Sequence, residues 1–148
     1  MNRLDSDLLK LLLKDGRMSY ADLARQLDIS RAHARDRVQH LVESGVIEQF
    51  TAVVNPASLG KVISTFIDLK AAPFALESLA QELAACPEVI NLYIMSDLKS
   101  LHIHTLTHSQ EAFDQFARRY LTGREEITSL YCTNLLSRVK HGEGGAKL

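Results

Sequence analysis

The chain has 148 residues, 46% of them hydrophobic and only 6% aromatic, so its length allows one domain of ordinary size or two small ones. Its 17 basic and 18 acidic residues leave a net charge of -1, which excludes a global positive field, so any attraction to nucleic acid must be confined to one face. Two isolated cysteines, the absence of a leader-like N-terminus and the absence of a bilayer-length apolar run favour a cytoplasmic protein with no membrane partner.

Three short helices are predicted at the start of the chain. The first follows Asp5, the expected N-cap, and runs to about Lys14. The second begins after Ser19, and the third begins after Ser30 and ends before Gly45. Apolar residues recur at helical spacing in each of them. A turn of about three residues separates the last two helices, which is typical of the helix-turn-helix.

The third helix is unusually rich in hydrogen-bond donors. Ala34, Val38 and Leu41 form one narrow apolar stripe, and the other faces are basic and polar. A charged, solvated face is the simpler interpretation, but the preceding turn favours a DNA recognition helix that lies in a major groove. The expected DNA-binding residues are Tyr20, Ser30, Arg31, His33, Arg35, Arg37, Gln39 and His40.

Two β-prone runs follow the third helix, at residues 46–50 and 51–54, and we expect them to form the two strands of a wing. Residues 1–54 are therefore predicted to be a winged helix-turn-helix domain. An Asn-Pro turn at Asn55 and a glycine at Gly60 separate two different hydrophobic periodicities. We place a linker at residues 55–61.

The rest of the chain predicts the order strand, helix, strand, strand, helix, strand over residues 62–141. The strands are expected at 62–71, 89–95, 100–107 and 127–140, with helices after Pro73 and Ser109. This order indicates a ferredoxin-like βαββαβ domain, an antiparallel sheet with both helices on one face, so the whole chain is α+β. Apolar residues on both sides of the first strand predict that a second copy covers the open face. Residues 142–148 have no core-forming pattern and are expected to be a disordered tail.

Several motifs occur in series: residues 19–24, Ile29 and Ser30, residues 35–38, residues 45–47, and Asn-Pro-x-x-Leu-Gly at 55–60. Together they resemble the Lrp/AsnC (leucine-responsive, feast-famine) family of bacterial and archaeal transcriptional regulators, and the resemblance runs from Leu4 to Lys140. It implies a DNA reader joined to a ligand-sensing domain that dimerises, assembles into octamers or similar rings, and binds an amino acid between dimers. It also implies control of genes for amino-acid metabolism or transport.

The resemblance places the effector at the loop between the second and third strands and on the last strand. The family usually has Gly-Asp-aromatic-Asp in that loop and threonines on that strand. Because glycine permits positive φ, and because a lysine replaces the last acid of the loop, the site is either retuned or lost. The expected effector-binding residues are Ser96, Asp97, Leu98, Lys99, Leu130 and Cys132.

Two alternatives stay open. His102 and His104 alternate on one strand and His108 follows it, so a metal-responsive regulator is one of them. The other is a tetrapyrrole (siroheme-type) decarboxylase on the same two-domain plan, with His102, His104, Arg118 and Arg119 at its substrate. The main prediction is a transcriptional regulator that is no enzyme and needs neither cofactor nor metal. Its expected partners are double-stranded DNA, further copies of itself and an amino-acid effector.

Overall fold

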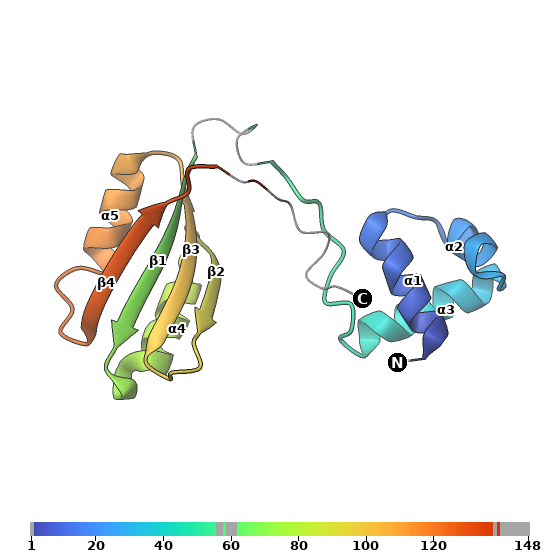
Figure 1. Cartoon of the computed structure of the whole chain (residues 1–148), viewed down its shortest axis with the longest axis horizontal. Helices are drawn as coiled ribbons and strands as arrows, with labels where there is room; N and C mark the ends of the chain where they lie inside the picture. The colour runs from blue at the N-terminus through green and yellow to red at the C-terminus, as the bar shows by residue number, and fades with distance from the viewer. Residues whose placement is uncertain (1, 56–57, 59–61, 138, 140–148) are drawn as a thin grey trace. The chain divides into compact units, whose positions relative to one another are not determined.

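The computed structural model describes residues 2–55, 58, 62–137 and 139. The chain divides into two compact units, one formed by residues up to Val54 and the other running from Asn55 to Arg138 (Figure 1). Most of the predicted linker and all of the predicted tail lie outside the described residues. Among the helices that are described, none is long and apolar enough to cross a membrane.

The first unit contains the three predicted helices, α1 (Arg3–Lys14), α2 (Tyr20–Leu27) and α3 (Arg31–Glu43). Helix α1 begins earlier than predicted because Asn2, and not Asp5, is its N-cap. The Asn2 side chain accepts a hydrogen bond from the Asp5 backbone N–H at 2.8 Å, and the Asp5 carboxylate accepts one from the Asn2 N–H at 3.1 Å. This reciprocal capping box satisfies two backbone donors that a helix start otherwise leaves unpaired.

The core of the first unit is built from one apolar stripe of each helix. The buried side chains interlock between the three helices, and Leu8, Leu23 and Ala34 are completely shielded from solvent. Burial of such side chains is the main force that holds short helices together, since isolated helices of this length are marginal in water. The remaining buried members are Leu9, Ala24, Val38 and Leu41.

The predicted wing strands are not formed. After α3 the chain bends at Val46 and Ile47, and residues 48–55 have no regular structure. The Ile47 N–H donates to the Leu41 carbonyl at 2.9 Å, which ties the start of the segment to α3. The two β-prone runs join directly at Phe50 and Thr51, with no Gly, Asn, Asp or Pro to reverse the chain. They therefore continue as one segment instead of folding back into a hairpin.

The second unit is the predicted ferredoxin-like fold. Its elements are β1 (Ile63–Ala71), the short 3-10 helix η2 (Pro73–Ala75), α4 (Leu76–Ala84), β2 (Val89–Ile94), β3 (Ser100–Thr107), α5 (Gln110–Tyr120) and β4 (Ile127–Asn134). All neighbouring strands are antiparallel, in the order β2-β3-β1-β4. Strand β4 ends at Asn134 and not at Lys140, because Asn134 already pairs with Thr65 near the start of β1 and little partner strand is left.

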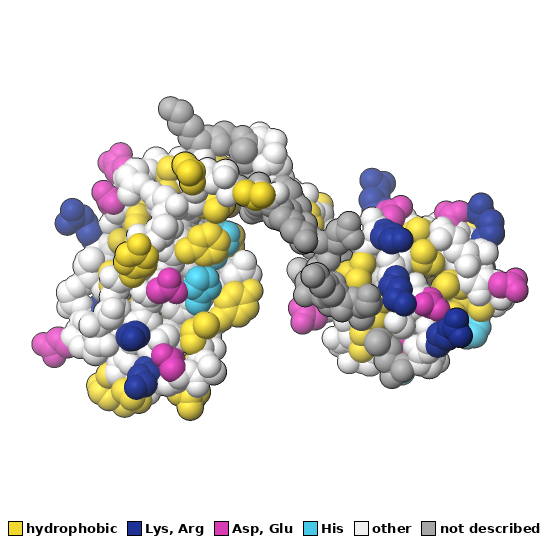
Figure 2. Space-filling model, viewed as in Figure 1, with side chains coloured by type: hydrophobic (Ala, Val, Ile, Leu, Met, Phe, Trp, Pro, Cys, Tyr) yellow, Lys and Arg dark blue, Asp and Glu magenta, His cyan; other side chains and the backbone are white. Residues whose placement is uncertain are grey.

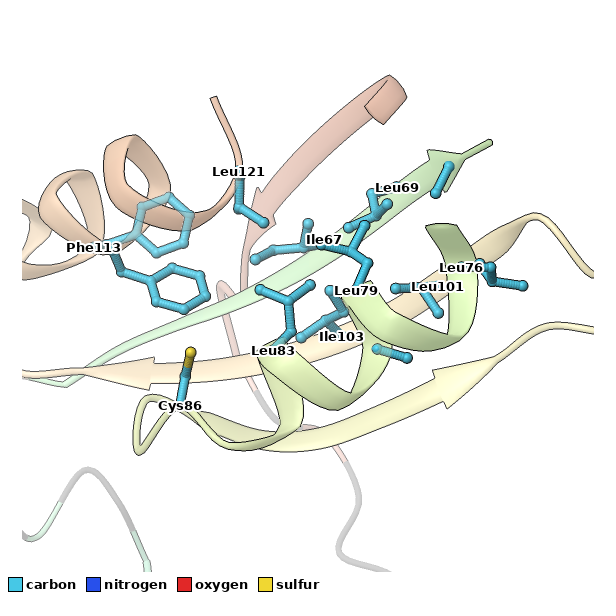
Figure 3. Packing of buried hydrophobic residues seen from close by; sticks show 13 residues of the cluster. Ile67, Leu69, Leu76, Leu79, Leu83, Cys86, Leu101, Ile103, Phe113 and Leu121 are labelled. Carbon is cyan, nitrogen blue, oxygen red and sulfur yellow. The ribbon is translucent and has the colours of Figure 1, made fainter. Parts of the chain in front are cut away.

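Helices α4 and α5 cover the same side of the sheet (Figure 1). The core between the two layers is drawn in Figure 3. The sheet contributes two side chains from β1 and two from β3, which pack against side chains of α4 and α5 and the adjoining Leu121. The strand residues are Ile67, Leu69, Leu101 and Ile103, and the helix residues are Leu79, Leu83, Phe113 and Phe116. These strand residues alternate with outward-facing ones, as a sheet covered on one side requires.

We call the opposite side of the sheet the open face, because neither α4 nor α5 covers it. Strand alternation and register place there the aromatic residues Phe66, Tyr93 and Tyr131 together with His102, His104, Asp68 and Lys70. Figure 2 shows hydrophobic, histidine and acidic side chains side by side on this unit. The prediction of an uncovered face is correct, but the face is more polar than expected, because the aromatic side chains are interspersed with polar and charged ones along the strands.

Candidate functional site

Helix α3 is fixed by its cap and by its buried stripe. The Ser30 hydroxyl accepts a hydrogen bond from the His33 N–H at 3.1 Å, which caps the helix and leaves the exposed O–H able to donate to another partner. Ala34, Val38 and Leu41 are buried against α1 and α2. The other faces project Arg31, His33, Arg35, Gln39 and His40, all of which are exposed. The structure thus exposes five of the predicted DNA contacts on one helix, with Arg31, Arg35 and Gln39 along one side and His33 and His40 along another.

The turn before α3 depends on one unusual backbone conformation. Asp28 is the C-cap of α2 and has φ 53° and ψ 48°, in the left-handed region that Asp tolerates better than most residues. The Ala24 carbonyl accepts hydrogen bonds from the N–H groups of both Asp28 and Ile29. This tight reversal sets the direction in which α3 leaves α2.

Arg37 differs from the prediction that it lies on the DNA-binding surface. Its Nε donates to Asp5 Oδ1 at 2.9 Å, and its Nη2 donates to the same oxygen. The two side chains are 25% and 5% exposed, so this ion pair is largely shielded from water. Hydrogen bonding from Arg37 is the main reason why the pKa of the Asp5 carboxyl lies below its ordinary value, although burial opposes the shift. Arg37 therefore links α3 to α1 and is not part of the exposed set.

A hollow of about 550 Å³ lies beside α3 in the first unit. Tyr20 and Arg31, both predicted DNA contacts, line it together with Arg17 from the turn between α1 and α2. Its apolar lining includes Leu12, Met18, Val38 and Phe50. Arg17 had no place in the sequence prediction, because it stands in a turn and belongs to no periodic pattern.

The predicted effector loop lies at one end of the open face. Ser96 and Asp97 line a second hollow, of about 400 Å³, with Asp68 and Lys70 of β1. Ser100, Ser129, Tyr131, Met95 and Leu69 complete its lining. Asp97 accepts hydrogen bonds from the Ser100 hydroxyl at 2.6 Å and from the N–H groups of Lys99 and Ser100. These bonds, that of the Ser100 hydroxyl first, lower the pKa of Asp97 and favour its ionised form.

The six predicted effector residues do not share one surface. Leu130 and Cys132 stand opposite Leu69 and Ile67 in the β1–β4 register, which places them on the helix side of β4. Their neighbours Ser129 and Tyr131 point to the open face and line the hollow instead. The prediction was wrong for Leu130 and Cys132 as partners of the loop, because strand parity puts them on the other face.

The loop also differs in where its positive φ falls. Leu98 has φ 55°, whereas Ser96, which replaces the glycine of the family pattern, is not among the positive-φ residues. A leucine in the left-handed region costs backbone energy of about 1 kcal/mol. Leu98 is 69% exposed, so the conformation is held by the turn, in which the Leu98 N–H donates to the Met95 carbonyl at 3.0 Å, and not by packing of the side chain.

Two family models divide the chain between them. The one described as winged helix-turn-helix DNA-binding matches residues 1–48, and the one described as Lrp/AsnC ligand binding domain matches residues 64–144, more than half of the chain. The chain belongs to the Lrp/AsnC family. It is accordingly a DNA-binding transcriptional regulator that carries a ligand-binding domain.

Proteins similar to this chain match it over nearly its whole length. An uncharacterised HTH-type transcriptional regulator of Pyrococcus horikoshii is 31% identical over 140 residues, which are 95% of this chain and 88% of the relative. A counterpart of Pyrococcus furiosus is 30% identical over 95% of this chain and 94% of its own length. Escherichia coli AsnC has the same fold, with a TM-score of 0.84 at 24% identity over 96% of each chain. So has a Neisseria meningitidis transcriptional regulator in complex with L-Met, with a TM-score of 0.83 at 21% identity over 95% and 93%.

The histidines of this Lrp/AsnC chain are engaged within the open face. His102 Nδ1 lies 2.7 Å from Asp68 Oδ1, and His104 Nε2 lies 2.6 Å from Ser64 Oγ. The Phe66 ring stacks on both imidazoles, with ring centroids 5.8 and 4.3 Å apart. Within the described part of the chain, no group of three or more His, Cys, Asp or Glu side chains could hold a metal ion. The three histidines proposed for a metal site thus form no such group.

The residues proposed for the decarboxylase alternative are not brought together. His102 and His104 belong to the open face, whereas Arg118 and Arg119 lie at the end of α5 in the helix layer. Arg119 stacks over the Tyr120 ring at 5.2 Å, and both arginines are exposed. The sheet separates the two pairs, so one substrate cannot contact all four in this chain.

Proposed function

We propose that the exposed face of α3 reads a specific DNA sequence and that the protein controls genes of amino-acid metabolism or transport. The observation that carries this proposal is the exposure of Arg31, His33, Arg35, Gln39 and His40 on a capped helix that is buried only along one narrow stripe. Arg and Gln side chains are suited to bidentate contacts with guanine and adenine edges. A protein that reads DNA works in the compartment that holds it, so cytoplasmic localisation belongs to the same proposal.

Arg35 gives the sharpest test of this surface. Its guanidinium pairs with Asp36 at 3.0 Å, but both side chains are 61% exposed, and such surface pairs are weak enough to yield to DNA. If Arg35 reads a base, Arg35→Ala weakens binding to the preferred duplex by about 1 to 3 kcal/mol and relaxes the preference at one position. The preferred duplex comes from selection out of a random library, and fluorescence titration measures affinity.

The matched control for Arg35 is Arg118→Ala, which removes an exposed arginine from the other unit. We expect it to bind DNA like the wild type. If Arg35→Ala lowered affinity equally for every sequence and reduced the salt slope by about 1, Arg35 would contact phosphate only. Unchanged affinity together with an unchanged salt slope would remove Arg35 from the interface.

We further propose that two copies join through the open face. One helix-turn-helix unit buries too little surface for high specific affinity, and a second copy adds a second half-site about one helical turn, roughly 34 Å, away. Tyr93 and Tyr131 on that face are 57% and 66% exposed, which supports its role as a contact surface. The linker predicted at 55–61 would connect the helix-turn-helix unit of each copy to the dimerised second unit.

Exposed apolar residues at one end of the sheet support assembly beyond the dimer, into an octamer or a similar ring. Phe74 of η2 is 89% exposed, and Leu98 of the β2–β3 loop is also largely exposed. A hydrogen bond of 2.8 Å from the Ala71 N–H to the Lys99 carbonyl holds the end of β1 against the β2–β3 loop. Two large apolar side chains at one end of the sheet suit a contact between dimers.

The hollow beside Ser96 and Asp97 is the proposed effector site. It presents the carboxylates of Asp68 and Asp97 and the ammonium of Lys70, both signs of charge that a zwitterionic amino acid needs. Its place in a ligand-binding domain and the fold shared with an L-Met complex support this choice. Binding there would act by favouring one assembly over another, since a ligand shifts an equilibrium only through differential affinity.

Thermal-shift screening against the twenty amino acids tests the effector proposal. We expect at least one to raise the melting temperature of the wild type, since a ligand at about 100 times its Kd stabilises by about 2.7 kcal/mol. Lys70→Ala should lose this response, because it removes the partner of the ligand carboxylate. Glu77→Gln, on the exposed side of α4, should keep it. A flat response to all twenty would contradict an amino-acid effector.

A further inference from the structure

The arginines of the DNA-binding unit fall into two groups. Arg3, Arg25, Arg35 and Arg37 each have a carboxylate within ion-pair distance. Arg17 and Arg31 have no such partner among the residues that the structure describes. Both are exposed, and both line the 550 Å³ hollow at α3. The two arginines without a carboxylate partner among the described residues therefore line the same hollow.

The acidic groups near this place are directed elsewhere. Asp15 turns its carboxylate to the Arg17 backbone N–H at 2.9 Å, and Asp22 pairs with Arg25 and accepts the Ser19 hydroxyl hydrogen at 2.6 Å. Neither carboxylate lines the hollow. The hollow therefore carries two positive charges, whereas the other arginines of this unit are paired with carboxylates. The apolar side chains that line the hollow lower the local dielectric constant and strengthen the electrostatic field of the two arginines.

The position of the hollow suits a contact with the DNA backbone. Arg31 is the first residue of α3, so it stands next to the surface proposed to read bases, and Tyr20 offers a phenol hydroxyl at the same rim. Phosphate oxygens are the commonest partners of Arg and Tyr in protein–DNA contacts, and such contacts fix the register of a recognition helix. Guanidinium groups hold a phosphate by paired, charge-assisted hydrogen bonds.

We propose that Arg17 is a DNA-binding residue and that Arg17 and Arg31 together hold one backbone phosphate at this hollow, with Tyr20 as a third donor. The inference rests on the proposed DNA reading by α3. It divides the work on DNA between two groups: Arg17 and Arg31 position the unit on the backbone, and Arg35, Gln39 and the two histidines face the bases.

Salt-dependent titration of a random-sequence duplex tests this proposal on the full-length protein. Arg17→Ala and Arg31→Ala should each weaken binding about tenfold, as expected for loss of a charged hydrogen-bonded contact. The double variant should lower the slope of log Kd against log salt by about 0.9, the value for one phosphate, and two independent phosphates would lower it by about 1.8. Arg25→Ala is the matched control, since it removes an exposed but paired arginine of α2 and should leave affinity and slope unchanged.

The outcomes separate this inference from the function on which it rests. If the wild type binds the duplex and Arg17→Ala binds equally well with an unchanged slope, Arg17 is no DNA contact and the inference fails alone. A slope loss of about 1.8 in the double variant overturns the shared phosphate. If the wild type shows no salt-dependent binding to any duplex, DNA binding by α3 itself is wrong. Unchanged melting temperatures of the variants would show that each change acts on binding and not on folding.

Discussion

The ion pair between Asp5 and Arg37 fastens the reading helix to α1. Asp5 accepts two hydrogen bonds from Arg37 and also closes the capping box with Asn2, so one buried carboxylate serves both helices. A buried charge that loses its partner is costly, because neither water nor another group replaces it. The angle between α1 and α3, and with it the presentation of α3, depends on this residue.

Asp5→Asn should lower the free energy of unfolding by about 2 to 3 kcal/mol, since it leaves the Arg37 guanidinium without its anion. Urea unfolding followed by circular dichroism measures the change. Asp7→Asn removes an exposed carboxylate of the same helix that pairs with Lys10 at 3.2 Å, and it should cost less than about 1 kcal/mol. Equal effects of the two substitutions would contradict the structural role of Asp5.

The same pair predicts how stability depends on pH. The pKa of Asp5 is lowered in the folded protein, chiefly by hydrogen bonding from Arg37, from an unfolded value of about 3.9. Its contribution is therefore complete above that unfolded value and is lost as the pH falls through the lower folded pKa. The stability difference between wild type and Asp5→Asn should shrink below about pH 4. A difference that stayed constant down to the lowest pH at which both fold would refute this.

For single residues, the sequence predicts which side chains are hydrogen-bond donors better than it predicts which partner each side chain faces. It identified the exposed donors of α3 correctly, because helical spacing alone separates them from Ala34, Val38 and Leu41. It misassigned Arg37, since the partner Asp5 is 32 positions away in the sequence and only the packing of α1 against α3 reveals the pair. Arg17 could not be found at all, because a turn has no periodicity to read.

The open face of the sheet is the element-scale feature on which assembly depends. The Phe66 ring stacks on the imidazoles of His102 and His104, while Tyr93 of β2 and Tyr131 of β4 stay exposed. A stacked row flanked by exposed tyrosines is a preorganised surface, and aromatic residues contribute much of the energy at protein interfaces.

Tyr93→Glu should disrupt the proposed dimer, because it buries an unpaired charge between the two copies at little cost to the monomer, in which Tyr93 is exposed. Analytical ultracentrifugation should show the wild type as a dimer or larger and the variant as smaller. Gln115→Glu, which adds the same charge on the exposed side of α5, should sediment like the wild type. A wild type that sediments as a monomer at micromolar concentration would contradict the dimer proposal.

At the scale of elements the sequence performs well where periodicity is strong. Periodicity correctly predicts all three helices of the first unit and the βαββαβ order of the second. The predicted wing strands do not form, because β-propensity at residues 46–54 does not make a hairpin when no turn joins the two runs. The effector strand shows the other limit. Which of Leu130 or Tyr131 faces the loop depends on the β1–β4 register, and a shift of one residue reverses the answer.

For the whole molecule, the two units divide the function. The first unit has eight basic and eight acidic residues up to Val54, so its attraction to DNA depends on a few unpaired side chains and not on net charge. The second unit carries the hollow, the open face and the apolar end of the sheet, the three features proposed for effector binding and assembly. Assembly through the second unit should therefore set how strongly the first unit holds DNA.

Paired α3 helices that read DNA sequence-specifically should require two half-sites at the correct spacing. The most direct test is titration of the full-length protein onto the selected two-site duplex, a scrambled duplex and a duplex with the half-site spacing changed by about half a helical turn. We predict that the selected duplex binds at least about 1,000-fold tighter than the scrambled one, and that the spacing change removes most of this advantage. Equal affinity for all three duplexes would contradict the account.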